Sequence, residues 1–161
     1  MKRILALLCC LLLPLDADAI AVTEPTAQVA STTDTTSYSL AAFTPSANAG
    51  LFVFVHASST VAAGTMSGGS LTWVRLTSIA SNSGADTSYL FYAVTGSSPA
   101  STTATFDCTG DAATGAILMI WEATGINTAN PVRQFNSAAT TSTNPAISLS
   151  SNMMTSNAYI A

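Results

Sequence analysis

The feature that most constrains the fold of this chain is an alternation of apolar and polar residues in short stretches between turn-forming residues. The clearest case is 51–57, in which Leu, Val, Val and Ala alternate with Phe, Phe and His. Similar stretches, separated by Gly, Pro and Asn, lie at 37–43, 71–79, 88–94, 102–108, 116–123, 132–137 and 146–149. A period of two residues is typical of β-strands, whereas a helix has a period of about 3.6. The pattern therefore predicts an all-β chain.

Short strands joined by tight turns are typical of antiparallel sandwiches. We therefore expect one antiparallel β-sandwich, of jelly-roll or immunoglobulin-like type, over residues 37–161. In 51–57 and 116–123 both faces are apolar, which predicts central strands that are covered on both sides. The last residues, 158–161, resemble the start of another strand. Either the domain lacks C-terminal strands that a longer gene product would supply, or another molecule completes the sheet.

The N-terminus has the pattern of a secretory signal peptide. Two basic residues precede an apolar run at 4–13, and Ala17-Asp18-Ala19 supplies the small residues that signal peptidase recognises. This run is shorter than the roughly 20 residues that a membrane-spanning helix needs. We expect a signal peptide at 1–19, a Ser/Thr-rich segment at 20–36, and no membrane span after cleavage. An uncleaved anchor is the alternative.

The chain is poor in charge and rich in hydroxyl groups. It has 24 Thr and 21 Ser, and only 7% of its residues are charged, against about 25% in a typical soluble domain. The net charge of −4 excludes a basic surface for nucleic acid. Because few charges guard the strand edges, we expect copies of the chain to associate through those edges.

Three segments occur in an order that resembles a known module. Leu-Thr-Trp at 71–73 precedes Leu-Phe-Tyr-Ala-Val at 90–94, and Ile-Trp-Glu-Ala-Thr-Gly-Ile-Asn at 120–127 precedes Asn-Pro-Val at 130–132. This order resembles a recurrent β-sandwich module of bacterial secreted or surface proteins and phage virion proteins, over residues 38–161. The resemblance implies an extracellular or virion-surface module without a defined chemistry, and it assigns no functional residue.

The sequence offers one candidate for a catalytic base. His56 is the only histidine, and Ser58 and Ser59 follow it closely. One hypothesis is therefore that His56, oriented by a carboxylate, is the general base for one of these serines. The chain has no Gly-x-Ser-x-Gly motif around such a serine. The position of His56 on the same face as Phe52 and Phe54 instead favours a packed or hydrogen-bonded histidine.

Acidic residues allow two further hypotheses. Glu122 and Asp107 could be the acid pair of a glycosidase, but the place of Glu122 at a strand end favours turn capping. Asp107 and Asp111 could offer oxygen ligands to Ca²⁺, and an ordinary polar turn is the alternative. A zinc site is weaker, because the mature chain has one His and one Cys. The one cysteine of the mature chain, Cys108, shares a strand face with Phe106. We therefore expect it to be a buried thiol.

An aromatic ring outside the core could stack on the apolar face of a sugar, and the candidates are Trp73, Tyr89, Tyr92 and Trp121. The alternation places Trp73 and Trp121 in the interior, where large aromatic residues dominate packing. Tyr38 and Tyr89 are then the rings expected to be exposed, and we predict that they bind ligand.

These observations favour a non-catalytic module, secreted or on the cell surface, that serves adhesion or structure and binds glycans weakly. The alternative is a virion protein with a structural or receptor-binding role, such as a fibre or decoration component. A hydrolase is third, because none of the candidate groups forms a recognised constellation. No cofactor is expected apart from the Ca²⁺ that Asp107 and Asp111 could hold.

Overall fold

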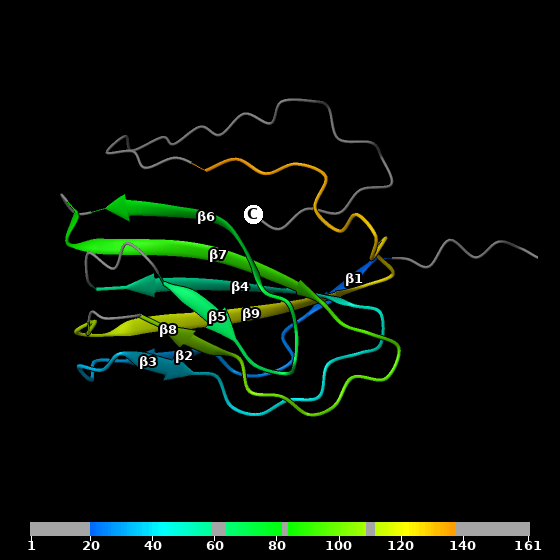
Figure 1. The fold of residues 1–161 in the computed structure, drawn as a ribbon, viewed down its shortest axis with the longest axis horizontal. Coiled ribbons are helices and arrows are strands. Elements are labelled where there is room, and N and C mark those ends of the chain that lie inside the picture. Colours follow the sequence, from blue (N-terminus) through cyan, green and yellow to red (C-terminus); the bar gives the residue numbers. More distant parts are fainter. Residues whose placement is uncertain (1–19, 59–63, 82–83, 109–111, 138–161) are drawn as a thin grey trace, which may run out of the picture.

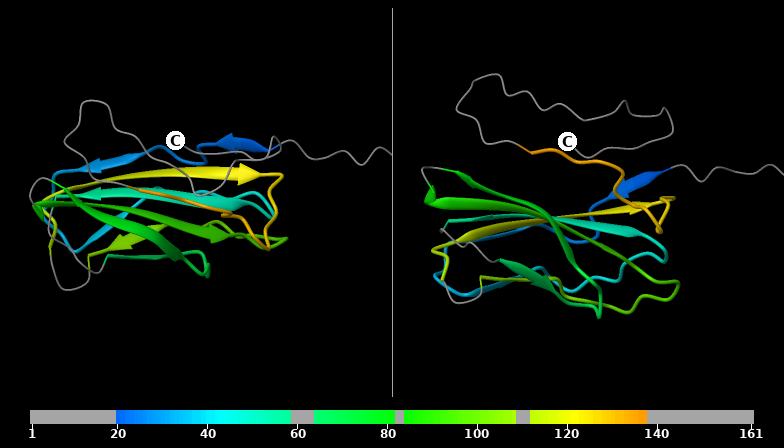
Figure 2. Two further views of the ribbon diagram at one scale, coloured as in Figure 1. Left: turned by 90° about the horizontal axis from the view of Figure 1, so that it is seen from above. Right: turned by 45° about the horizontal axis from the view of Figure 1, so that its top comes forward.

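The structure is a computed structural model that describes residues 20–58, 64–81, 84–108 and 112–137. These residues form two antiparallel sheets packed face to face (Figures 1 and 2). The all-β antiparallel sandwich that the alternation predicts is therefore confirmed. Its assignment to the jelly-roll or immunoglobulin-like type stays a prediction.

The larger sheet is built around three long strands, β4, β7 and β9. Its order is β1-β9-β4-β7-β6, and β2 also pairs with β9. The bounds are β1 Ala21–Thr23, β2 Val29–Ser31, β4 Gly50–Ala57, β6 Val74–Ser81, β7 Asp86–Val94 and β9 Ala116–Thr124. The smaller sheet has the order β3-β8-β5, with β3 Ser37–Ser39, β5 Thr65–Ser67 and β8 Thr105–Asp107.

The structure moves two boundaries that the sequence suggests. The segment 20–36, expected to precede the sandwich, contributes β1 and β2 to the larger sheet, both paired with β9. The stretch 132–137, expected to be a strand, is irregular. The expected strand at 146–149 lies outside the described residues. In the described part of the chain, no helix is long and apolar enough to span a membrane.

The hydrophobic core lies between the two sheets. Every second residue of the central strands points inward, and the large apolar side chains buried in this way are Leu51, Val53, Val55, Tyr89, Phe91, Leu118 and Ile120. Tyr38, Met66 and Phe106 close the core from the smaller sheet. Burial of this apolar surface is the main favourable term in folding.

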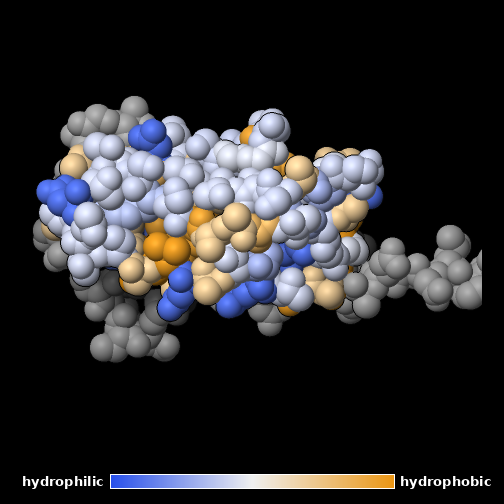
Figure 3. All heavy atoms as spheres, turned by 90° about the horizontal axis from the view of Figure 1, so that it is seen from below, coloured by the Kyte–Doolittle hydropathy of each residue, from blue (hydrophilic) through white to orange (hydrophobic). Residues whose placement is uncertain are grey.

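The alternate residues of the same strands make a second apolar surface, which we call the outer face. It consists of the partly exposed side chains of Phe52, Phe54, Leu90, Tyr92, Met119 and Trp121. The surface seen from below is different, because weakly polar residues cover most of it and the largest group of apolar residues lies near its middle (Figure 3). The hydroxyl-rich composition explains those pale areas, since Ser and Thr solvate a surface without charge.

Candidate functional site

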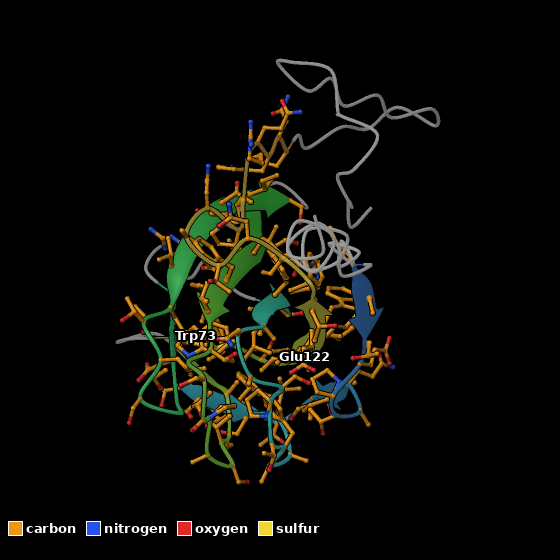
Figure 4. All side chains as sticks on the ribbon, turned by 90° about the vertical axis from the view of Figure 1, so that its right-hand side faces the viewer. Trp73 and Glu122 are labelled. Carbon is orange, nitrogen blue, oxygen red and sulfur yellow. The ribbon has the colours of Figure 1, made fainter. Side chains whose placement is uncertain are left out.

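Three loops meet at one end of the sandwich, which we call the loop end. They are 44–49 before β4, 68–73 before β6 and 95–102 after β7. Backbone hydrogen bonds tie the first loop to the third, from the Thr95 amide to the Ala49 carbonyl and from the Asn48 amide to the Gly96 carbonyl, both 2.9 Å. Figure 4 looks onto this end and shows Trp73 and Glu122 on either side of it. The loop end is therefore one connected structure.

Glu122 holds the first loop in place. Its side chain is only 5% exposed, and its two carboxylate oxygens accept hydrogen bonds from the amide and the hydroxyl of Ser46, each 2.7 Å long. The Thr95 hydroxyl donates to the Ser46 carbonyl over 2.8 Å. The turn-capping role that the sequence favours for Glu122 is confirmed. A buried carboxylate needs such donors, because an unpaired charge away from water is costly.

Trp73 closes the second loop. Its indole Nε1 donates to the Gly68 carbonyl over 3.2 Å, and the Leu71 amide donates to the same oxygen over 3.2 Å. Gly68 has φ +120°, and a Cβ there would collide with the Thr103 carbonyl oxygen. Only glycine adopts this backbone conformation without strain. The glycine-rich sequence therefore lets this loop pack directly against the third loop.

The loops enclose a shallow pocket of about 320 Å³ at this end. Its wall consists of short side chains and backbone, and no residue in it is charged; the lining residues are Pro45, Gly69, Ser70, Leu71, Gly96, Ser98, Pro99, Ala100 and Thr102. Polar and apolar groups contribute to this wall in similar measure, whereas most small-molecule sites have mainly apolar walls with a few polar groups.

Thr102 is the least satisfied polar residue at the loop end. It is 6% exposed, and its hydroxyl has no hydrogen-bond partner within the described ranges. The hydroxyl lies behind Gly69, where a Cβ would come within 2.5 Å of it. A buried hydroxyl without a partner is unfavourable by about 1–3 kcal/mol. This wall of the pocket therefore contains a hydroxyl, that of Thr102, to which no described residue offers a hydrogen bond.

The expectation that Tyr38 and Tyr89 are exposed is wrong. They are 4% and 1% exposed, so neither ring can stack on a sugar. The Tyr38 hydroxyl lies 2.7 Å from the Thr33 carbonyl and 2.6 Å from the Ala113 carbonyl, both acceptors. The Tyr89 ring packs against Phe106 with centroids 5.2 Å apart. Burial raises the pKa of both phenols above their ordinary value near 10.

The two tryptophans also differ from each other. Trp73 is partly buried and packs against the core, as the alternation predicts. The interior position expected for Trp121 is wrong, because this residue lies on the outer face and is partly exposed. Both faces of β7 and β9 are apolar, so the sequence pattern did not distinguish the inward face from the outward one.

His56 lies at the opposite end of β4. Its Nδ1 is 3.0 Å from the hydroxyl of Ser88, its partner on β7, and the prediction of a hydrogen-bonded histidine is confirmed. His56 and Ser58 line a second hollow of about 260 Å³. The Ser58 carbonyl accepts from the Thr114 hydroxyl over 3.0 Å. These contacts hold the strand ends together.

The calcium hypothesis concerns Asp107 and Asp111. Asp107 is an exposed residue at the end of β8, paired with Ser37 and Thr65, and Asp111 lies outside the described residues. Among the residues that the structure describes, no three His, Cys, Asp or Glu side chains gather as a metal site would require. Calcium binding stays a prediction. Cys108 is fully buried, as expected.

Searches of protein-family models, curated proteins and solved structures find no match to this chain. The loop-end pocket is the feature that sequence reasoning missed. The only available signal was compositional, since the three loops that form it are rich in Gly, Pro and Ser. Their convergence depends on sheet topology, which brings the ends of β7 and β9 next to the start of β4.

Proposed function

We propose that this protein is a non-catalytic module, exported and held at a surface for adhesion or structure, that binds neutral glycans weakly through the loop-end pocket. The observation that carries the proposal is the lining of that pocket, which combines backbone and Ser and Thr hydroxyls with apolar Pro, Leu and Ala. Sugars present hydroxyl groups around C–H faces. Such a pocket complements both kinds of group without a charge.

The Glu122 carboxylate supports a non-catalytic role. Both of its oxygens accept hydrogen bonds from Ser46, whereas a general acid or base must be free to reach the proton that it transfers. Glu122 instead holds the loop before β4 in place. His56 Nδ1 lies 3.0 Å from the hydroxyl of Ser88. Weak affinity is expected, because the pocket is shallow and buries little of a ligand.

An array of neutral oligosaccharides, followed by saturation-transfer NMR with the best hit, tests glycan binding by the mature chain. Ser98→Trp fills the pocket and should abolish the transfer signal. Ser101→Trp, on the same loop but outside the lining, is the matched control and should retain it. If no neutral glycan binds at millimolar concentration, or if Ser98→Trp binds like the parent, this proposal is wrong.

Export has its own test. N-terminal sequencing of the secreted protein should begin at Ile20-Ala21-Val22, as the signal-peptide pattern predicts. An extracellular protein that retains Met1 would contradict cleavage. Because this measurement does not involve the pocket, it can fail or succeed independently of glycan binding.

A further inference from the structure

The outer face is continuous across the three central strands. Pairing in the sheet places Tyr92, Phe52 and Trp121 side by side in one row, and the Phe52 and Tyr92 rings stack with centroids 6.4 Å apart. Leu90, Phe54 and Met119 form the next row. Six large apolar side chains side by side are typical of a surface that is buried in the folded protein. A contiguous apolar surface on a soluble protein marks a place where something binds.

The chain turns onto this face directly after the end of β9. Gly125, with φ 72°, reverses the backbone after β9, and Ile126 follows. Gly50 and Phe52 share the outer side of β4, because alternate residues of a strand point the same way. A Cβ on Gly50 would lie 2.6 Å from Ile126 Cδ1 and 3.2 Å from the Phe52 ring. Ile126 therefore already covers one corner of the outer face.

The end of the described chain reaches the same side of the sheet at β6. The Ser137 hydroxyl is 2.8 Å from the hydroxyl of Thr77, and Thr77 pairs with Leu90 of the outer face. Figure 1 shows this last described segment, in orange, running beside β6. The chain beyond Ser137 therefore starts next to the partly exposed rows of the outer face.

From these contacts we propose that residues 138–161 of the same chain cover the outer face. The segment has 24 residues and no charged side chain, and an extended chain of that length spans about 80 Å, several times what is needed. Ile147, Leu149, Met153 and Tyr159 occupy positions that differ by even numbers. An extended chain would therefore present these four apolar side chains on one side, which could lie on the face.

A second copy of the chain is the competing occupant, because the scarcity of charge at the strand edges predicts self-association. The contacts of Ile126 and Ser137 favour the chain itself, since both lie on the path from β9 to the segment. Covalent attachment also holds the segment at a high effective concentration, which a second molecule lacks at ordinary protein concentrations.

Photo-crosslinking of the mature chain distinguishes the two occupants. Tyr92→benzoylphenylalanine places a photoreactive group on the outer face, and Ser67→benzoylphenylalanine, on exposed Ser67 of the smaller sheet, is the control. In a mixture of ¹⁴N- and ¹⁵N-labelled protein, we expect crosslinks from position 92 to peptides of 138–161 of the same isotope. Crosslinks of mixed isotope identify a second copy and overturn the proposal, as does the absence of any crosslink to 138–161.

A second measurement uses the segment itself. Ile147→Ser together with Leu149→Ser should raise the fluorescence of the apolar dye ANS several-fold, because the face beneath becomes accessible. Ser148→Asn, between the two positions, is the matched control and should leave the dye signal unchanged. Equal dye binding by the double variant and the parent would overturn the proposal even if every variant folds.

Discussion

Both oxygens of the Glu122 carboxylate accept hydrogen bonds from one residue, Ser46, which donates its amide and its hydroxyl at 2.7 Å each. The two residues are 76 positions apart in the chain. The contact fixes the loop before β4 to the end of β9, and the Thr95 hydroxyl extends it to the end of β7. One acidic residue thus connects the ends of three adjacent strands.

Removal of the carboxylate should destabilise the domain. Glu122→Ala removes the buried carboxylate that accepts two hydrogen bonds from Ser46, and we expect a loss of about 1–3 kcal/mol in the free energy of unfolding, because the exposed Ser46 donors can turn to water instead. Ser46→Ala removes only the hydroxyl donor and should cost about 1 kcal/mol. Urea denaturation of the mature chain measures both. If the midpoint of Glu122→Ala equals that of the parent, the contact does not stabilise the fold.

Two phenylalanines make a matched pair for testing the core. Phe106 is fully buried between the sheets, whereas Phe135 is 50% exposed. Phe106→Ala should lower the unfolding free energy by about 3–5 kcal/mol, because it removes buried apolar surface and leaves a cavity. Phe135→Ala should change it by less than about 0.5 kcal/mol. Equal effects in thermal or urea unfolding would contradict the assignment of the core.

Two glycines of the loop end test the backbone argument. Gly68→Ala forces a Cβ onto the Thr103 carbonyl at φ +120°, and we expect a loss of more than about 1 kcal/mol. Gly96→Ala meets no atom within 4 Å and should be neutral or slightly stabilising, because Ala restricts the unfolded chain. Differential scanning calorimetry of the two variants gives the comparison. A stable Gly68→Ala protein would show that the loop does not need glycine.

The buried phenols predict loss of stability at alkaline pH. Burial raises the folded-state pKa of Tyr38 and Tyr89 above the value near 10 of the unfolded chain. Above pH 10 the unfolded state therefore binds fewer protons than the folded state, and stability falls as pH rises toward the folded-state pKa. Urea midpoints between pH 8 and pH 11.5 should decline from about pH 10. The decline should be shallower in Tyr38→Phe, which is less stable at neutral pH because it loses a hydrogen bond. A parallel decline in both proteins would exclude Tyr38 as its source.

Cys108 provides a probe of native-state opening. Its side chain is fully buried, so a thiol reagent such as DTNB should react only after the domain opens. We expect labelling to be slower than for a small thiol by several orders of magnitude in buffer, and complete within the mixing time in concentrated urea. Rapid labelling in buffer would place the thiol at the surface.

The alternation of residues was enough to predict the long strands and the sandwich, because local backbone geometry and a period of two determine which side chains share a face. It did not predict β1 and β2, and it wrongly predicted a strand at 132–137. It also located Glu122 at a strand end, where its capping role could be inferred. The inward face could not be chosen in the same way. In β7, Tyr89 and Phe91 on one face are as apolar as Leu90 and Tyr92 on the other. The local pattern therefore does not predict which of the two faces is buried.

In the folded protein, packing of the smaller sheet determines which face of the larger sheet is buried. Phe106 of β8 packs against Tyr89 and Phe91, with ring centroids 5.2 Å and 6.2 Å away, which buries those rings and leaves Tyr92 and Trp121 on the outer face. The sequence by itself determined the long strands β4, β6, β7 and β9, their approximate limits and the scarcity of charge, but not the short strands β1, β2 and β5. Tertiary structure alone decided which rings are buried and which loops form a pocket, because both depend on contacts between residues far apart in the chain.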